Sequence, residues 1–280
     1  MTVVTRFAPS PTGLLHLGHV HSVLFAVAAA RRAGGRFLLR IEDIDGGRCR
    51  PEFETAIYED LAWLGLCWEE PVRRQSEHMA DYAVALARLA GMGLIYPCFC
   101  TRADIRAEIA RAPGAPHGPE GPVYPGTCRH LTAAEREERL AAGAPYAFRL
   151  DTARARAVTG RLHWHDRGRG EMAADPGAHG DVVLARKDAP ASYHLAVTVD
   201  DALQGVTLVT RGEDLVPATG VHRLLQALLD LPLPDYHHHG LIAGSDGRRL
   251  AKRDGAATVR ALREGGRSAS EVRALAGFPD

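Results

Sequence analysis

The chain has 280 residues, enough for one large domain or two modest ones with a substantial core. Its hydrophobic content of 46% and charged content of 24% are ordinary for a globular protein, and its formal net charge of zero predicts no broad attraction to nucleic acid. The longest apolar run, Val23 to Ala30, is too short to span a bilayer, and no secretory signal pattern begins the chain. Five cysteines, an odd number, disfavour a secreted disulfide framework, so we expect a cytoplasmic protein.

The N-terminal stretch predicts a strand, a turn and a helix. A short apolar run from Val3 to Phe7 leads into a turn rich in Pro, Ser and Gly, and a second apolar run extends from Val20 to Ala30. His16 and His19 are expected on one face of the first helical turn, where unpaired N–H groups and the helix dipole favour a polyphosphate. The alternative interpretation is a β–turn–α corner with two surface histidines.

A second buried strand is predicted from Phe37 to Ile41, after a glycine pair that would end the helix. It leads into an acidic turn, Glu42-Asp43-Ile44-Asp45. In an open α/β sheet, ligands bind at this end of the strands, although a solvated acidic turn is the alternative. Helical periodicity over Glu52 to Leu66 and over Met79 to Met92 predicts two helices that cover the sheet.

Three cysteines surround a long irregular stretch, from Ala112 to Gly126, that is crowded with Pro and Gly. Such a stretch is usually functional, mobile or held by something. The thiols of Cys98, Cys100 and Cys128 could hold it through a metal, and thiolates favour zinc with four ligands. The fourth ligand could be His117, Tyr124 or His130, and chemistry alone prefers a histidine because a phenol must lose its proton. The alternative is three unconnected buried thiols.

The second half of the chain predicts further short elements. A helix begins at the capping box Thr132-Ala133-Ala134-Glu135. Strands are expected over Ala147 to Leu150, Val182 to Ala185, Tyr193 to Val199 and Val206 to Thr210, and a helix over Val221 to Leu229. The most basic segment, Arg161 to Arg169, contains Trp164, so it could bind an RNA backbone and stack on a base, or form a solvated hairpin.

Lysine is rare in this chain, and one of its lysines lies in a distinctive loop. Basic positions are almost all arginine, with lysine only at 187 and 252. Lys252 belongs to the glycine-bounded basic stretch Asp246 to Gly255, which is suited to closing over phosphates, although such a stretch is often only an exposed turn.

Several separated stretches together resemble the class I glutamyl-tRNA synthetases, over nearly the whole chain. In order they are R-F-A-P-S-P-T-G with H-L-G-H, then I-E-D-I-D, Y-H-L-A-V-T-V-D-D, R-G-E-D-L and R-L-A-K-R-D-G. The resemblance implies an α/β fold: a Rossmann-like (HUP-type) nucleotide-binding domain with a parallel sheet, in two halves at 1–95 and 188–280. A zinc-bearing α+β insertion at 96–187 would split it, and a short helical end with no anticodon-binding domain would complete the chain.

The cysteine pattern is similar to that of the glutamyl-Q tRNA(Asp) synthetase branch of this family. That resemblance implies zinc ligands Cys98, Cys100, Tyr124 and Cys128, with the tyrosine in place of a histidine. It also implies a ligase that joins L-glutamate to queuosine in the anticodon stem-loop of tRNA(Asp), with ATP as substrate, Mg²⁺ beside it, and no membrane partner; we expect a monomer. The nearest alternative is a short enzyme that charges a tRNA 3′ end, followed by a small nucleotidyltransferase and a zinc-bearing RNA-binding module.

The same resemblance assigns roles to individual residues. The glutamate pocket would be formed by Arg6, Ala8, Ser10, Glu42, Tyr193 and Arg211, and the ATP site by His16, Gly18, His19 and Lys252. His16, His19 and Lys252 would stabilise the phosphate during attack by the glutamate α-carboxylate. The family's K-[ML]-S-K motif is altered here, since Arg249 replaces its first lysine and Ala251 removes its serine hydroxyl.

Overall fold

The structure is a computed structural model that describes residues 2–111, 117–118, 121–186, 190–242 and 257–279. Its strands are β1 (Val4–Phe7), β2 (Arg36–Ile41), β3 (Glu69–Arg74), β4 (Ile95–Cys98), β5 (His117–Gly118), β6 (Gly121–Pro122), β7 (Ala147–Leu150), β8 (His163–Asp166), β9 (Gly170–Ala173), β10 (Val183–Arg186), β11 (Leu208–Gly212) and β12 (Asp235–His239). Its helices are α1 (Leu17–Arg32), α2 (Pro51–Trp63), α3 (Met79–Gly91), α4 (Arg102–Arg111), α5 (Ala133–Ala141), α6 (Thr152–Thr159), α7 (Tyr193–Leu203), α8 (Thr219–Leu228), α9 (Val259–Glu264) and α10 (Ala269–Leu275). Short 3₁₀ turns lie at Gln75–Glu77, Thr127–His130, Pro176–His179 and Glu213–Leu215.

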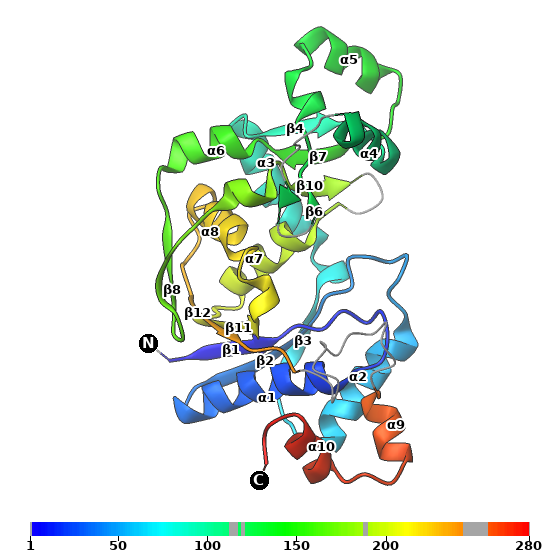
Figure 1. Ribbon diagram of the computed structural model, residues 1–280, viewed down its shortest axis with the longest axis vertical. Coiled ribbons are helices and arrows are strands. Elements are labelled where there is room, and N and C mark those ends of the chain that lie inside the picture. The colour runs from blue at the N-terminus through cyan, green and yellow to red at the C-terminus, as the bar shows by residue number, and fades with distance from the viewer. Residues whose placement is uncertain (1, 112–116, 119–120, 187–189, 243–256, 280) are drawn as a thin grey trace.

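A parallel sheet lies at the centre of the fold, as predicted. Strand β2 pairs in parallel with both β1 and β3, and β11 pairs in parallel with β12. The two groups meet where the Thr207 N–H donates to the Val4 carbonyl oxygen at 3.0 Å, which places β11 beside β1. Helix α1 lies on one side of these strands and α7 on the other (Figure 1). The strands therefore run in the order β3-β2-β1-β11-β12.

The return from α1 into β2 depends on a glycine. A Cβ atom on Gly35 would lie 2.1 Å from the Val3 carbonyl oxygen, so only glycine lets the chain pass this close to the strand it joins. The next residue, Arg36, donates its N–H to the same oxygen at 2.8 Å. This turn sets the register of β2, whose carboxyl end then leads into Glu42 beside the end of β1.

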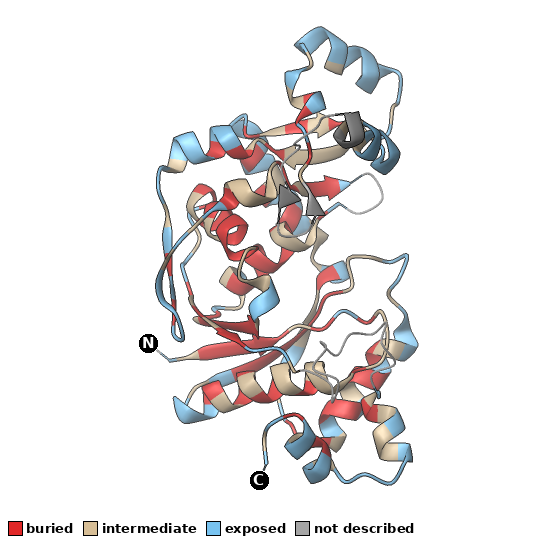
Figure 2. Ribbon diagram, viewed as in Figure 1, coloured by how far each residue is buried: buried red, intermediate tan, exposed pale blue. Residues whose placement is uncertain are grey.

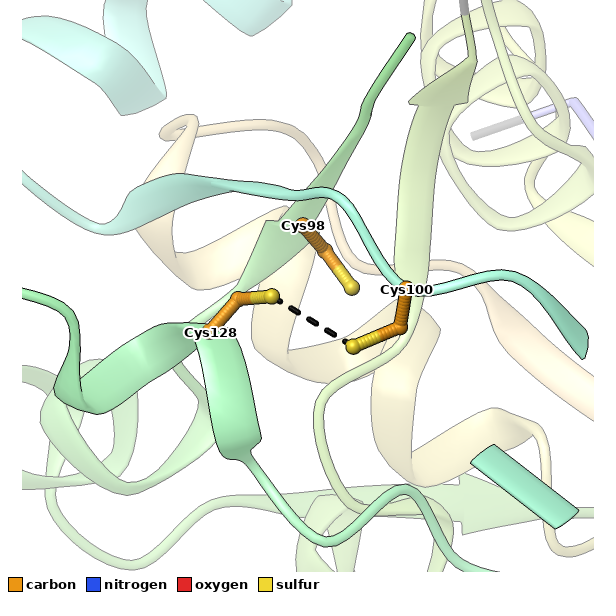
Figure 3. Close-up of side chains that lie close together, drawn as sticks. All are labelled: Cys98, Cys100 and Cys128. Atoms are coloured by element: carbon orange, nitrogen blue, oxygen red, sulfur yellow. Dashed lines mark hydrogen bonds between the residues drawn. The ribbon is translucent and has the colours of Figure 1, made fainter. Parts of the chain in front are cut away.

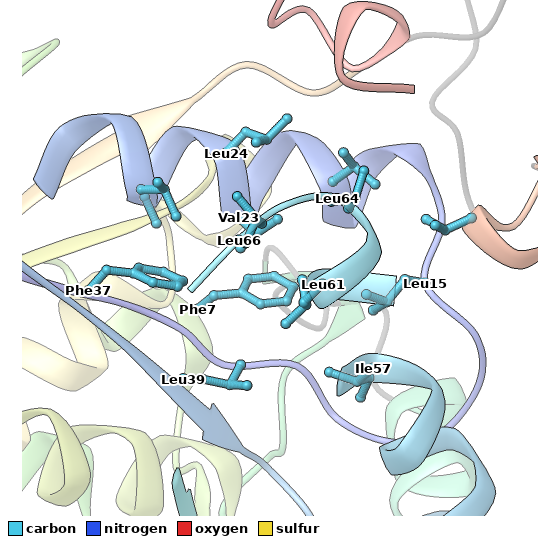
Figure 4. Packing of buried hydrophobic residues seen from close by; sticks show 14 of the residues in the cluster. Phe7, Leu15, Val23, Leu24, Phe37, Leu39, Ile57, Leu61, Leu64 and Leu66 are labelled. Atoms are coloured by element: carbon cyan, nitrogen blue, oxygen red, sulfur yellow. The ribbon is translucent and has the colours of Figure 1, made fainter. Parts of the chain in front are cut away.

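Two apolar clusters lie on opposite sides of the parallel strands. The first joins α1 and α2 to β1 and β2, with Phe7, Val23, Leu39 and Ile57 in contact (Figure 4). The second is formed mainly by α3, α7 and α8; α7 and α8 are buried along much of their length, whereas α3 buries one face only (Figure 2). Both faces of the central strands are therefore covered, as is usual for parallel sheets, although β1, β2 and β11 each carry a buried arginine.

Strand β4 begins a separate antiparallel sheet of order β10-β7-β4, and β8 with β9 forms an antiparallel hairpin. For the basic segment Arg161 to Arg169, the sequence left two interpretations open, an RNA-binding surface and a hairpin, and the structure shows the hairpin. Trp164 is 4% exposed and packs edge-on against Tyr236, so its ring cannot stack on an RNA base. The expectation of an exposed stacking platform is therefore wrong at this residue.

The predicted strand from Tyr193 to Val199 is wrong, because these residues form α7. The β-branched residues of this stretch favour a strand locally. In the folded protein Leu195, Ala196 and Val199 lie on one helical face and pack into the second apolar cluster. Burial of that face outweighs the weak local preference, since tertiary packing supplies most helix stability.

The described residues end in two short helices, α9 and α10. Helix α10 packs on α1, where the His21 ring nitrogen lies 2.9 Å from the Ala276 carbonyl oxygen. Within the described ranges, no helix is both long enough and apolar enough to cross a membrane.

Candidate active site

The two histidines of the N-terminal motif cap helix α1. His16 is the N-cap residue, in extended conformation, rather than a member of the first turn; His19 is the third helical residue. The His16 Nδ1 atom accepts the Gly18 N–H at 3.1 Å, while the His19 Nδ1 atom accepts the His16 N–H at 3.2 Å. Because both Nδ1 atoms accept, each neutral ring carries its proton on Nε2.

This reciprocal capping corrects one expectation. Two of the N–H groups that were expected to be unpaired, those of His16 and Gly18, are occupied by imidazoles. The rings themselves stand 3.8 Å apart at their centroids and both line the same pocket. An anion at this helix end would therefore meet imidazole Nε2–H donors rather than the whole set of backbone donors.

Replacing His16 separates capping from phosphate contact. His16→Ala removes the cap, so we expect the free energy of unfolding to fall by about 1 kcal/mol, whereas His16→Asn keeps a good N-cap and stays near wild type. Both variants lose the imidazole and should slow ATP–pyrophosphate exchange to a similar degree. Urea unfolding measures the first effect. If ATP–pyrophosphate exchange is slow in His16→Ala but normal in His16→Asn, the His16 ring serves only as a helix cap.

One pocket of about 520 Å³ collects residues from distant parts of the chain. It lies at the carboxyl ends of β1, β2 and β11, beside the start of α1. Every described residue assigned to glutamate or ATP lines it: Arg6, Ala8, Ser10, His16, Gly18, His19, Glu42, Tyr193 and Arg211. Lys252, with Arg249 and Ala251, lies outside the described residues.

The described residues that flank the stretch containing Lys252 lie at this pocket on both sides. Gly240, Leu241 and Ile242, which precede it, line the pocket. After it, Thr258 forms a β-bridge with His16, and the Val259 N–H donates to the Leu15 carbonyl oxygen at 2.9 Å. The described residues before the stretch therefore line the pocket, and those after it pair with the chain at His16.

A buried ion network that the sequence analysis missed supports the side of the pocket that was predicted to bind glutamate. Arg40 is 0% exposed; it donates to Asp201 at 2.9 Å and to Glu42 at 3.3 Å, and it lies 3.7 Å from Asp200. Arg6 also donates to Asp201, at 2.9 Å. The signal available in the sequence was a charged residue within the apolar strand β2, since a buried arginine requires acidic partners.

Burial changes the pKa of Glu42, the carboxylate of this network that lines the pocket. The pKa of Glu42 is raised because burial penalises its charged form, although Arg40 and Arg6 oppose this effect. An ammonium group bound beside Glu42 would restore part of the stabilisation that water no longer supplies. The pKa of Asp201 is lowered despite its burial, because Arg6 and Arg40 both contact it.

Arg211, at the end of β11, is surrounded differently from Arg6. Its guanidinium lies against the side chains of Thr219, His222 and His238, and 3.5 Å from the Tyr193 hydroxyl. Neither histidine was identified from the sequence. Tyr193 begins α7, so the correction of this element from strand to helix still leaves the predicted residue in the pocket.

Three of the four predicted zinc ligands form a compact thiol cluster. The Sγ atoms of Cys98, Cys100 and Cys128 all lie within 4.8 Å of one another (Figure 3). Zinc bound tetrahedrally to thiolates at about 2.3 Å would hold sulfur atoms roughly 3.8 Å apart. The Cys100 and Cys128 sulfurs are 3.4 Å apart, so the cluster could hold such a metal with small adjustments.

The Tyr124 hydroxyl lies at the cluster as well, 3.3 Å from the Cys98 sulfur and 3.8 Å from that of Cys100. Its ring stacks under Arg149, whose Cζ is 3.9 Å from the ring centroid. His130 is exposed, and the His117 side chain is outside the described part of the chain. The chemical preference for histidine is therefore not supported at His130, and the buried phenol is the oxygen donor beside the thiols.

Comparisons with known proteins agree with this arrangement. The family model described as "tRNA synthetases class I (E and Q), catalytic domain" matches residues 2–270. A glutamyl-Q tRNA(Asp) synthetase of Rhodobacter capsulatus is 50% identical over 99% of this chain and 100% of its own length. A glutamate–tRNA ligase of Aquifex aeolicus is 42% identical over 94% of this chain, but this covers only 54% of that protein.

A solved structure extends the likeness to the fold. The glutamate tRNA ligase of Elizabethkingia meningosepticum, crystallised with its amino acid, superposes with a TM-score of 0.81 at 30% identity. The superposition covers 99% of this chain and 60% of that one. Because the family model matches nearly the whole of this chain, residues 2–270, the chain belongs to the class I tRNA synthetases of the glutamate and glutamine type.

Proposed function

We propose that this protein activates L-glutamate with ATP and transfers the glutamyl group to queuosine in the anticodon of tRNA(Asp). The observation that carries the proposal is the convergence of Arg6, Glu42, Tyr193 and Arg211 with the two capping histidines in one pocket. Likeness to glutamyl-Q tRNA(Asp) synthetases over nearly the whole chain supports the choice of acceptor. The tRNA would meet the enzyme in the cytoplasm, and we expect the enzyme to act as a monomer. Its catalytic domain would be split by the insertion at 96–187.

The first step is an in-line displacement. An oxygen of the glutamate α-carboxylate bonds to the α-phosphorus of ATP, the bond to the bridging oxygen breaks, and pyrophosphate leaves. Glu42 would face the substrate ammonium and Arg211 a carboxylate, while Ala8, Ser10 and Gly18 line the walls around them. His16, His19 and Lys252 would stabilise the charge on the phosphates, which enter with Mg²⁺. Positioning and charge, rather than covalent chemistry by side chains, supply the rate.

The second step consumes the glutamyl-adenylate. A hydroxyl of the queuosine ring attacks the carbonyl carbon, AMP leaves with the bonding electrons, and the hydroxyl proton passes to solvent. This step forms an ester on the modified base, whereas the alternative enzyme would form it on the terminal ribose of a tRNA.

The acceptor is tested with labelled glutamate, ATP and tRNA from cells that make or lack queuosine, each with and without removal of the 3′-terminal adenosine. We expect label only on queuosine-containing tRNA, whether or not the 3′ end is intact. Equal labelling of both tRNA pools contradicts the proposal. Labelling that requires the 3′ adenosine identifies a short glutamyl-tRNA synthetase instead.

Zinc is the metal that the thiol cluster and Tyr124 fit best. Held by Cys98, Cys100, Cys128 and Tyr124, it would link β4 to the 3₁₀ turn at Thr127–His130 and so stiffen this part of the chain. The pKa of Tyr124 is raised by burial, so a bound cation would have to displace its proton. No catalytic step depends on this site.

Metal content tests the ligand set. We expect wild-type protein to carry one zinc per chain, measured by elemental analysis, and Cys128→Ser to carry almost none. Tyr124→Phe keeps the ring under Arg149 but loses the oxygen, so zinc affinity should fall ~10-fold or more. Cys67→Ser is the control, because Cys67 is exposed and outside the cluster. Unchanged affinity in Tyr124→Phe would exclude the phenol as a ligand.

A further inference from the structure

The guanidinium of Arg211 is held by three elements, and its hydrogen-bond partners among the described residues are all neutral groups. Its Nε atom donates to His238 Nε2 on β12 at 3.1 Å, and Nη2 donates to Thr219 Oγ1 on α8 at 2.7 Å. Its Nη1 atom lies 3.0 Å from His222 Nδ1, also on α8. The Tyr193 hydroxyl, 3.5 Å from Nη1, completes the set.

These contacts determine where the imidazole protons lie. A guanidinium can only donate, so both histidines must present a bare nitrogen to it. His238 therefore carries its proton on Nδ1, which donates to Asp166 Oδ2 at 2.6 Å. His222 carries its proton on Nε2, which donates to His194 Nδ1 at 3.1 Å. Both rings are neutral in this arrangement.

Burial and the nearby charge of Arg211 keep both rings neutral. They lower the pKa of His238 to about 4 and the pKa of His222 well below its usual value. An imidazolium at either position would direct an N–H at the guanidinium and break the contact. The histidines therefore act on Arg211 as acceptors without charge.

The other arginines near the pocket are held by carboxylates instead. Arg6 is paired with Asp201, and Arg40 with Asp201 and Glu42. In the part of the chain that the structure describes, none of the ion pairs includes Arg211. The hydrogen bond from Arg211 to His238 continues to a carboxylate, because the other ring nitrogen of His238 contacts Asp166. The His238 ring therefore stands between Arg211 and Asp166. Arg211 is thus fixed as firmly as Arg6 but keeps its positive charge for a ligand.

We propose that His222 and His238 are positioning residues that set the preference of the pocket for glutamate over glutamine, by fixing the Arg211 guanidinium with uncharged acceptors. The inference rests on the proposed function, because it names the ligand of Arg211 as the side-chain carboxylate of glutamate. An uncompensated cation in a desolvated pocket attracts a carboxylate far more than a neutral amide. A carboxylate in place of either histidine would neutralise Arg211 and remove most of that difference.

A matched pair of variants isolates the charge. His222→Asn and His222→Asp have nearly the same shape, and either can present an oxygen where Nδ1 lies. We expect KM for glutamate to be at least about 10-fold higher in His222→Asp than in His222→Asn, with a much smaller difference in kcat. The ratio of glutamine to glutamate activation should rise by about the same factor. The assay is ATP–pyrophosphate exchange with each amino acid.

A second pair keeps the test valid if His222→Asp does not fold. Thr219 contacts the guanidinium from the first turn of α8, where the helix dipole favours an acidic side chain. Thr219→Asp and Thr219→Asn should therefore show the same split in KM. Equal KM and equal amino-acid preference within both pairs would overturn the inference while glutamate-dependent exchange by wild type continues. Absence of that exchange in wild type would instead refute the proposed function.

Discussion

Replacing Arg40 with methionine is expected to lower the free energy of unfolding by about 3–5 kcal/mol. The reason is that Arg40 is 0% exposed and is ion-paired with three acidic side chains, those of Asp200, Asp201 and Glu42. Methionine fills similar space but leaves these buried carboxylates with less positive charge than they need. Urea unfolding followed by circular dichroism measures the loss.

Arg36→Met is the matched control, because Arg36 lies on the same strand and is also paired with a carboxylate. Its side chain is 53% exposed, so its pair with Glu69 should be worth no more than about 1 kcal/mol. A similar loss in both variants, or a loss below about 1 kcal/mol for Arg40→Met, would show that the buried network does not hold the sheet together.

The deficit of Arg40→Met should shrink as the pH falls. Burial already raises the pKa of Glu42 in the wild-type protein, and removal of Arg40 raises it further. A folded-state pKa above the unfolded value means that the folded chain binds more protons, so its relative stability is gained on acidification and lost as the pH rises. Unfolding curves for wild type and variant should therefore lie closer together at pH 5 than at pH 8.

Local signals in the sequence were enough to predict β1, α1 and β2, and the acidic turn after β2 that lies at the pocket. The apolar runs on either side of the Pro/Ser/Gly turn correspond to β1 and α1, and β2 follows the glycine turn as predicted. The acidic turn after β2 could be assigned to the ligand edge because parallel strands share their carboxyl ends. These inferences need only neighbours in the chain.

Contacts between distant residues could not be predicted in this way. Asp201 contacts Arg40 across 161 positions in the sequence, and His222 contacts Arg211 from a different element. The wrong strand at Tyr193 to Val199 has the same origin, because only packing against α3 and α8 makes the helix the better choice. The resemblance to a family could predict Arg6 and Arg211 as ligands, but it could not show that, among the described residues, Arg6 is ion-paired and Arg211 is not.

Lys252→Ala is expected to slow glutamate-dependent ATP–pyrophosphate exchange by a factor on the order of 10² or more, with no change in the circular dichroism spectrum. The residue lies outside the described part of the chain. Thr258, six positions later in the sequence, is bridged to His16.

The comparison with Lys187→Ala makes this test specific, since these are the two lysines in the sequence. Lys187→Ala should leave exchange near the wild-type rate if only Lys252 contacts the triphosphate. Lys252→Arg keeps the charge but spreads it over a planar group, so partial activity is expected. The altered motif narrows the alternatives: Ala251 offers no hydroxyl, so Arg249 is the other side chain in R-L-A-K that could stabilise the departing pyrophosphate. Exchange at the wild-type rate in Lys252→Ala would mean that arginines of the loop, rather than this ammonium, neutralise the phosphates.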